Sequence, residues 1–180
     1  MAFTNAPTLD LLGMAEAQES LSGAVPLRDL ARLRTGLAAL PPDAAADWQA
    51  EGLWRDAGAQ GRQPALHLRI RATLPLICQR CLETVPVPVQ VDRHFVFAPD
   101  EETAARWDAE LEDDVLVLQR PFDLAALLED ELILALPAIP RHAHCDNPPP
   151  LATQTGDFDA AAAPENPFAV LAGYGRKPRH

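Results

Sequence analysis

The sequence predicts an α+β fold: an antiparallel β-meander or small barrel-like sheet packed by a C-terminal amphipathic helix, with extended termini. Segments in which apolar and polar residues alternate follow one another through the middle of the chain. One segment of helical periodicity comes after them, and both ends of the chain lack either period. With 180 residues, of which 48% are hydrophobic, the chain is large enough for one domain with its own core. We expect an N-terminal extension over residues 1–24 and a core domain over residues 25–145.

The first expected element is a short amphipathic helix over residues 27–33, where Leu27, Leu30 and Leu33 share one face. Pro41 and Pro42 then break the chain, and the period of the apolar residues changes to two. Alternation of this kind is typical of strands, and the order of these segments along the chain favours antiparallel pairing. The alternating segments cover residues 48–54, 66–74, 85–97 and 115–118. Pro86 and Pro88 lack the N–H group that a sheet ladder requires, so we expect them at an edge or outside the sheet.

The clearest helix covers residues 124–135. Asp123 is suited to cap its N-terminus, and Phe122 and Leu127 are spaced for a hydrophobic staple. Leucines of this segment form one apolar stripe, which indicates that the helix packs on the sheet. Pro137 is expected to end it.

Residues 146–180 form an expected flexible linker and C-terminal docking peptide. Residues 146–167 are rich in proline and alanine and show no periodicity. Phe168 and Leu171 then restore apolar character shortly before a basic tip. An apolar anchor on a tether is typical of a docking peptide, so both residues are candidates for binding a partner. An ordinary frayed terminus is the alternative.

Charge is unevenly distributed along the chain. The formal net charge of −11 opposes nonspecific binding to nucleic acid. Residues 100–131 hold twelve acidic residues and two arginines, which is nearly the whole excess. Such a segment favours fast, salt-sensitive capture of a basic partner, and Glu112, Asp113 and Asp114 are its candidate contacts.

Residues 55–93 show the opposite balance, with six arginines and three acidic residues. Arg69 and Arg71 alternate along one expected strand, and Arg80 lies in the adjoining turn. Guanidinium groups bind phosphate in bidentate fashion, so these three residues are candidates for binding RNA. Two alternatives stay open. The face could be solvated and paired with the acidic segment, and the arginine content could reflect codon usage in a GC-rich genome.

A metal site is a further candidate. Cys78 and Cys81 form a C-x2-C knuckle after an expected strand, and Cys145 lies beyond the acidic helix. With either His142 or His144, these cysteines complete a Cys3His set, which suits structural zinc. A redox C-x2-C motif and unmetallated cysteines are the alternatives.

Recognisable catalytic motifs are absent from the sequence, which has no G-x-S-x-G, no Walker lysine loop and no dinucleotide fingerprint. No stretch approaches the ~18 apolar residues of a membrane span. The N-terminal residues do not resemble a secretion signal. We therefore expect a cytoplasmic protein with neither a membrane partner nor a small-molecule substrate.

Several sequence motifs also occur in a fixed order along the chain. The CQRCL run of residues 78–82 precedes a valine-rich strand that ends at Phe97, and an acidic loop follows. Residues 122–137 read FDLAALLEDELILALP, the His/Cys segment ends at Cys145, and NPFAVL covers residues 166–171. In this combination the sequence resembles the YceD family, the large ribosomal RNA subunit accumulation proteins.

The resemblance implies a ribosome-biogenesis factor that supports synthesis, processing or accumulation of 23S ribosomal RNA. The family is not known for catalysis and tends to be encoded beside a gene for a large-subunit ribosomal protein. Its implied partners are therefore ribosomal RNA or a basic ribosomal protein. Some relatives have two full cysteine pairs, whereas this sequence has His142, His144 and the single Cys145 in the second half. A zinc- or thiol-dependent enzyme acting on RNA is the alternative function.

Overall fold

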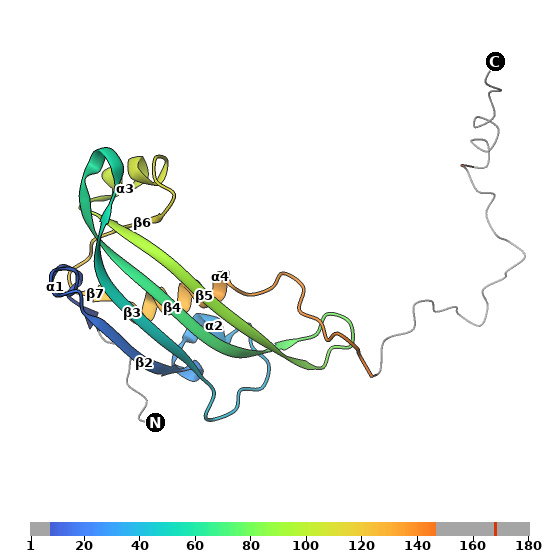
Figure 1. Ribbon diagram of the computed structural model, residues 1–180. Coiled ribbons are helices and arrows are strands. Elements are labelled where there is room, and N and C mark those ends of the chain that lie inside the picture. Colours follow the sequence, from blue (N-terminus) through green and yellow to red (C-terminus); the bar gives the residue numbers. More distant parts are fainter. Residues whose placement is uncertain (1–7, 147–167, 169–180) are drawn as a thin grey trace, which may run out of the picture. The chain divides into compact units, whose positions relative to one another are not determined.

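The structure is a computed structural model that describes residues 8–146 and 168 (Figure 1). The chain divides into two units, residues 1–147 and 148–180. Apart from Asp146 and Phe168, the expected linker and docking peptide, including Leu171, lie outside the described residues. Among the helices described, none is both long and apolar enough to cross a membrane.

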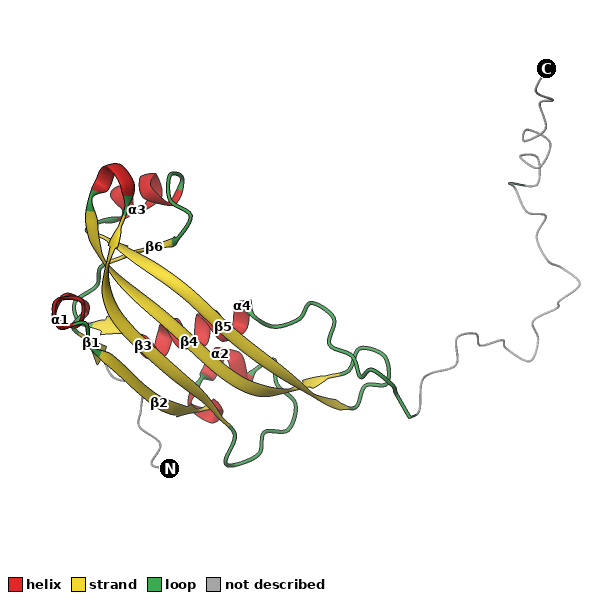
Figure 2. Ribbon diagram, viewed as in Figure 1, coloured by secondary structure: helices red, strands yellow, loops and turns green. Residues whose placement is uncertain are grey.

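The first unit is built on a five-stranded sheet in the order β2-β3-β4-β5-β6 (Figure 2). Neighbouring strands from β2 to β5 are antiparallel, as the alternating segments predicted. The two edge strands do not pair with each other, so the sheet is open rather than a closed barrel. The strands are β2 (Ser20–Pro26), β3 (Ala45–Asp56), β4 (Arg62–Ile77), β5 (Thr84–Ala98) and β6 (Asp114–Val117). A 3-10 turn, η2 (Gly58–Gln60), connects β3 to β4.

Strand β6 departs from the meander because it runs parallel to β5. A parallel neighbour needs a crossover connection, and helix α3 (Glu101–Asp108) supplies it. Asp100 caps this helix by accepting a hydrogen bond from the Thr103 amide, and Trp107 is buried against the sheet. The sequence of this acidic segment did not predict the helix.

One face of the sheet carries the main hydrophobic core and is covered by helix α4 (Leu124–Leu134), as predicted (Figure 1). Asp123 caps α4 through the Ala126 amide at 3.0 Å. Leu124, Leu128 and Leu132 of its apolar stripe are fully buried. The short helix expected over residues 27–33 is divided into a 3-10 turn, η1 (Leu27–Asp29), and one turn of α-helix, α2 (Ala31–Arg34).

Residues before β2 also belong to the packed structure. Strand β1 (Thr8–Leu9) pairs with β7 (Phe122–Asp123), and helix α1 (Leu11–Ala17) packs on β3. Leu9, Leu11 and Met14 are buried in the same core as the sheet. The hydrophobic core of the described structure therefore includes residues before position 25, from the segment expected to be an N-terminal extension.

Two prolines of β5 lie on an open edge of the sheet, as predicted. Strand β6 pairs only with residues 95–98 of β5, so the first part of β5 is an open edge of the sheet. Pro86 and Pro88 lie on that edge, where a missing N–H group leaves no ladder bond unmade.

Candidate metal centre

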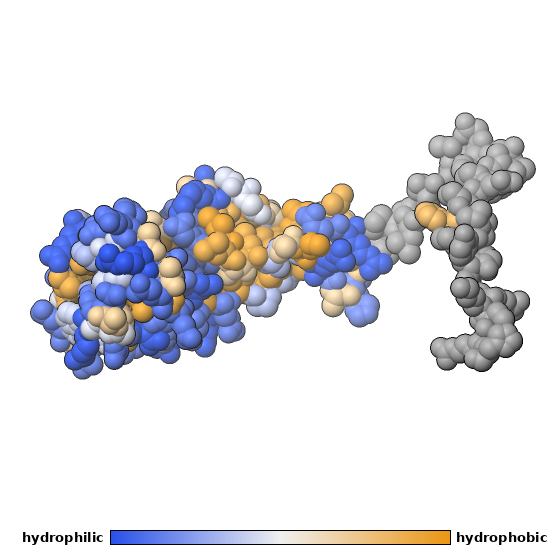
Figure 3. All heavy atoms as spheres, turned by 90° about the horizontal axis from the view of Figure 1, so that it is seen from above, coloured by the Kyte–Doolittle hydropathy of each residue, from blue (hydrophilic) through white to orange (hydrophobic). Residues whose placement is uncertain are grey.

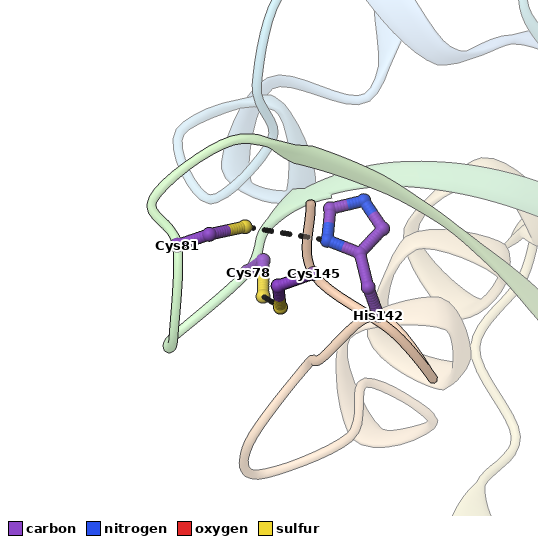
Figure 4. A group of neighbouring side chains, drawn as sticks. All are labelled: Cys78, Cys81, His142 and Cys145. Carbon is purple, nitrogen blue, oxygen red and sulfur yellow. Dashed lines mark hydrogen bonds between the residues drawn. The ribbon is translucent and has the colours of Figure 1, made fainter. Parts of the chain in front are cut away.

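Three cysteines and one histidine meet at the far end of the β4–β5 hairpin (Figure 4). Cys78 directly follows β4, and Cys81 lies in the turn before β5. His142 and Cys145 come from the segment that follows α4. The ligand atoms of all four side chains lie within 4.8 Å of one another. The structure therefore brings together residues separated by about sixty positions in sequence, the set expected to hold zinc.

Backbone hydrogen bonds hold the two arms of this cluster in place. The Leu82 amide donates to the Cys78 carbonyl at 2.9 Å, which closes the knuckle. Leu82 has a φ of 63°, a left-handed conformation that a tight turn requires and that disfavours a side chain. The Gln79 amide donates to the Pro140 carbonyl at 2.9 Å, which joins the knuckle to the segment after α4.

The donor set fits a tetrahedral zinc ion. Zinc with bonds of about 2.3 Å to sulfur and about 2.0 Å to nitrogen separates two sulfurs by about 3.8 Å and sulfur from nitrogen by about 3.5 Å. The Cys78 and Cys145 sulfurs lie 3.8 Å apart. The Cys81 sulfur lies 3.4 Å from His142 Nδ1. All three cysteines are free, so no disulfide competes for these sulfurs.

His142, rather than His144, belongs to the cluster. His142 Nε2 donates to the Thr84 carbonyl oxygen at 3.1 Å, because a carbonyl oxygen only accepts. That bond keeps the proton on Nε2 and leaves Nδ1, which faces Cys81, free to bind a metal. His144 is exposed and lies outside the cluster. The sequence had left the choice between the two histidines open.

The cysteines differ in acidity. Burial opposes ionisation of Cys78, but the backbone N–H groups of Cys81, His142 and Arg80 lower its pKa to about 5. Burial raises the pKa of Cys145 to about 11, and the sulfurs of Cys81 and Cys78 add to this effect. A divalent cation among the sulfurs would offset their mutual repulsion.

The arginines proposed to bind RNA do not form one group. Arg69 and Arg71 lie on the polar face of the sheet and line a hollow of about 460 Å³ together with Ser22, Asp47 and Gln49. Arg80 lies in the knuckle, beyond the end of β4 at Ile77. Ile77 lies six positions after Arg71, and at ~3.3 Å per residue this places the end of the strand about 20 Å away.

Arg69 has an unmet hydrogen-bonding group in this hollow. Its Nε atom is buried and has no hydrogen-bond partner among the described residues. Asp92 lies directly across from Arg69 in the β4–β5 ladder. However, the Asp92 carboxylate bonds to His67 Nε2 at 2.6 Å.

The acidic residues proposed to bind a partner are largely paired within the chain. Asp113 accepts two hydrogen bonds from Arg55, and Asp114 accepts one from Arg93 at 2.6 Å. Glu112 is exposed. The expected pairing between the arginine-rich strands and the acidic segment therefore exists, but it uses Arg55 and Arg93 instead of Arg69 and Arg71.

Two further acidic residues, Glu129 and Glu131 of α4, are buried. The Glu129 carboxylate accepts hydrogen bonds from the Arg32 and Leu33 amides and from the Arg32 side chain. Glu131 lies 3.4 Å from Arg93. Helical periodicity alone did not reveal these contacts, because their partners lie on distant elements.

The part of the chain that carries the Cys3His cluster matches a known protein family. The model of the family described as "Large ribosomal RNA subunit accumulation protein YceD" matches residues 66–173. The chain belongs to the YceD family. The matched range begins within β4 and contains all four residues of the Cys3His cluster.

A curated relative supports the same assignment. The large ribosomal RNA subunit accumulation protein YceD of Haemophilus influenzae is 33% identical over 123 residues. The alignment covers 61% of this chain and 64% of the relative, so the chain spans less than two thirds of the relative's length. No solved structure matches the chain.

Proposed function

We propose that the protein is a non-enzymatic factor that supports accumulation of 23S ribosomal RNA. The observation that carries this proposal is the family match over residues 66–173, together with the name that the family shares with the Haemophilus relative. The matched range includes the hairpin, the acidic segment, α4 and the Cys3His cluster, which are the most distinctive features of the described structure.

The Cys3His cluster fits a structural zinc ion better than a catalytic one. Cys78, Cys81, His142 and Cys145 supply four protein ligands, whereas catalytic zinc sites keep one position for water or substrate. The cluster joins the β4–β5 hairpin to the segment after α4, so a bound ion would stabilise the fold at that end. This donor set weighs against a zinc-dependent enzyme acting on RNA.

Two modes of binding follow from the charged surfaces. In the first, Arg69, Arg71 and Arg80 contact RNA phosphates. The hollow that contains Arg69 and Arg71, with the unpaired Arg69 Nε, supports this mode. Against it, Asp47 lines the same hollow and Asp92 lies across from Arg69, so the face is mixed rather than basic.

In the second mode the acidic segment binds a basic ribosomal protein. Residues 100–131 keep a large negative excess even after Asp113, Asp114, Glu129 and Glu131 are paired with arginines. A field of this sign repels RNA and attracts basic proteins. We favour the second mode for this reason.

Quantification of 23S relative to 16S ribosomal RNA tests the proposed function. Cells that lack the gene are expected to hold less 23S RNA, and the wild-type gene should restore it. An unchanged ratio in cells without the gene would refute the proposal.

Filter binding with 23S fragments separates the two modes. The double variant Arg69→Glu/Arg71→Glu is compared with Arg62→Glu, an exposed arginine of the same strand that does not line the hollow. Tight RNA binding that only the double variant loses would support the first mode. Weak RNA binding, with a basic ribosomal protein recovered on the purified chain, would support the second.

A further inference from the structure

A groove of about 310 Å³ lies where α3, β6 and the start of α4 meet. Its floor is apolar and includes Val115, Leu116 and Val117 of β6 and Ala126 of α4. All four side chains are half-buried, so the floor is accessible from outside. None of these residues belongs to the metal centre or to the arginine-lined hollow.

The groove follows an open edge of the sheet. Within the described part of the chain, β6 has β5 as its sole strand neighbour. Val115 and Val117 pack toward α3, whereas Leu116 packs toward the main core. Since all three line the groove, it runs along the side of β6 that has no strand beside it. The N–H and C=O groups of such an edge can pair with an added extended segment.

The adjoining open stretch of edge, on β5, is less suited to strand addition. Residues 84–94 of β5 are not paired with β6, but they contain Pro86 and Pro88. Prolines on an edge hinder strand addition. Residues 114–117 of β6 contain no proline.

Three carboxylates form the rim of the groove: Glu101, Asp123 and Asp130. Glu101 is exposed in the first turn of α3. Asp123 accepts one backbone hydrogen bond, and Asp130 pairs with Arg32 at 2.6 Å. Figure 3 shows the molecule from above. On the face seen there, hydrophilic residues dominate the end where α3 and β6 lie, and hydrophobic residues gather farther along. The rim therefore selects positive charge around a short apolar floor.

We propose that the groove along β6 binds an extended, basic segment of a partner protein, which adds to the sheet edge. Apolar side chains of that segment lie on Val115, Leu116 and Val117, and its lysines or arginines face the carboxylate rim. The proposal rests on the proposed function in one respect: it gives the basic partner of the second mode a defined site. The acidic rim disfavours RNA at the same place.

The test uses the full-length chain and a fluorescent nine-residue peptide that alternates arginine and valine. We expect saturable binding, roughly tenfold weaker for a peptide of arginine and glycine and undetectable for one of glutamate and valine. Bound peptide should slow hydrogen exchange of the β6 amides. Equal binding of the arginine–valine and arginine–glycine peptides would overturn the proposal, as would displacement of the peptide by a short RNA.

Two matched pairs of variants locate the site. Glu101→Lys should weaken binding about fivefold, whereas Glu102→Lys makes the same charge change in the same helical turn, outside the groove lining. Ala126→Gln should fill the groove and weaken binding, and Ala125→Gln is its control. Equal effects within both pairs would overturn the proposed site. Because these readouts use purified protein, their failure would leave the 23S measurement unaffected.

Discussion

At the scale of single residues, the pKa values of two buried glutamates of α4 shift in opposite directions. Burial acts against the charge of Glu129, but the Leu33 amide and then Arg32 outweigh it and lower its pKa. Burial dominates for Glu131, whose pKa is raised although Arg93 opposes the shift. At neutral pH the charged carboxylate of Glu129 therefore stabilises the folded chain, whereas that of Glu131 destabilises it.

Glu129→Gln is expected to lower the free energy of unfolding by about 1–3 kcal/mol at pH 7, because it weakens hydrogen bonds to a buried carboxylate. A carboxyl whose folded pKa is lowered stabilises the chain above its unfolded pKa. That contribution is lost as the pH falls through the folded pKa. The difference between wild type and variant, measured by urea unfolding, should therefore shrink toward acid. A difference that grows toward acid would contradict this assignment.

Glu131→Gln is expected to leave stability at pH 7 unchanged or to increase it. The raised pKa means that folding disfavours the charged carboxylate, and an amide removes that cost. The same urea titration checks this prediction. A loss larger than that of Glu129→Gln would show that the pair with Arg93 outweighs burial.

The two histidines beside the metal centre provide a matched pair. His142→Ala should reduce bound zinc, measured by mass spectrometry on the purified chain, from about one ion per chain to a small fraction of that. His144→Ala should leave the zinc content unchanged, since His144 is exposed and outside the cluster. Equal loss in both variants would indicate that His144 also ligates.

At the scale of elements, packing between α1 and β3 depends on one glycine. A Cβ atom at Gly52 would lie 2.5 Å from the Met14 backbone carbon, too close for any side chain. The Gly52 amide also donates to the Glu19 carbonyl at 2.9 Å. Helix α1 therefore approaches the sheet at a point where only glycine fits.

Gly52→Ala is expected to destabilise the chain by about 1–3 kcal/mol, because the contact is with backbone that cannot move without shifting α1. Gly36→Ala is the control, since its nearest contact would be an ordinary 3.6 Å to the Leu33 carbonyl oxygen. Thermal unfolding of both variants measures the difference. Similar melting temperatures would mean that α1 packs more loosely than described.

The elements also show what the sequence could and could not predict. Strands β3, β4 and β5 and helix α4 are long enough for their periods to be recognised. Helices α1 and α3 are short, and each is stabilised by caps and by contacts with distant strands. The C-x2-C knuckle was recognisable from spacing, but the choice of His142 depended on its hydrogen bond to Thr84, which only the fold provides.

At the scale of the whole chain, the net charge is −11 although several acidic residues form ion pairs with arginines of the same chain. Arg32, Arg55 and Arg93 pair with acidic residues that lie far away in sequence and thereby tie the acidic segment to the rest of the first unit. Exposed pairs of this kind contribute little each. The excess that remains is available to attract a basic partner.

Removal of metal should destabilise the first unit as a whole. Chelation of the purified chain is expected to lower the melting temperature by at least about 4 °C, since we expect a loss of ~2–4 kcal/mol and each kcal/mol shifts the melting temperature of a chain of this size by ~2–4 °C. Added zinc should reverse the change. A melting temperature insensitive to both treatments would exclude a structural role for the Cys3His cluster.

We propose that the fold supports accumulation of 23S ribosomal RNA and that it needs a metal ion at the Cys3His cluster to do so. The most direct test is the ratio of 23S to 16S RNA in cells whose sole copy of the gene carries His142→Ala or His144→Ala, with protein levels measured in parallel. We predict a reduced ratio for His142→Ala and a wild-type ratio for His144→Ala. A wild-type ratio in His142→Ala cells, with zinc absent from the purified variant, would contradict it.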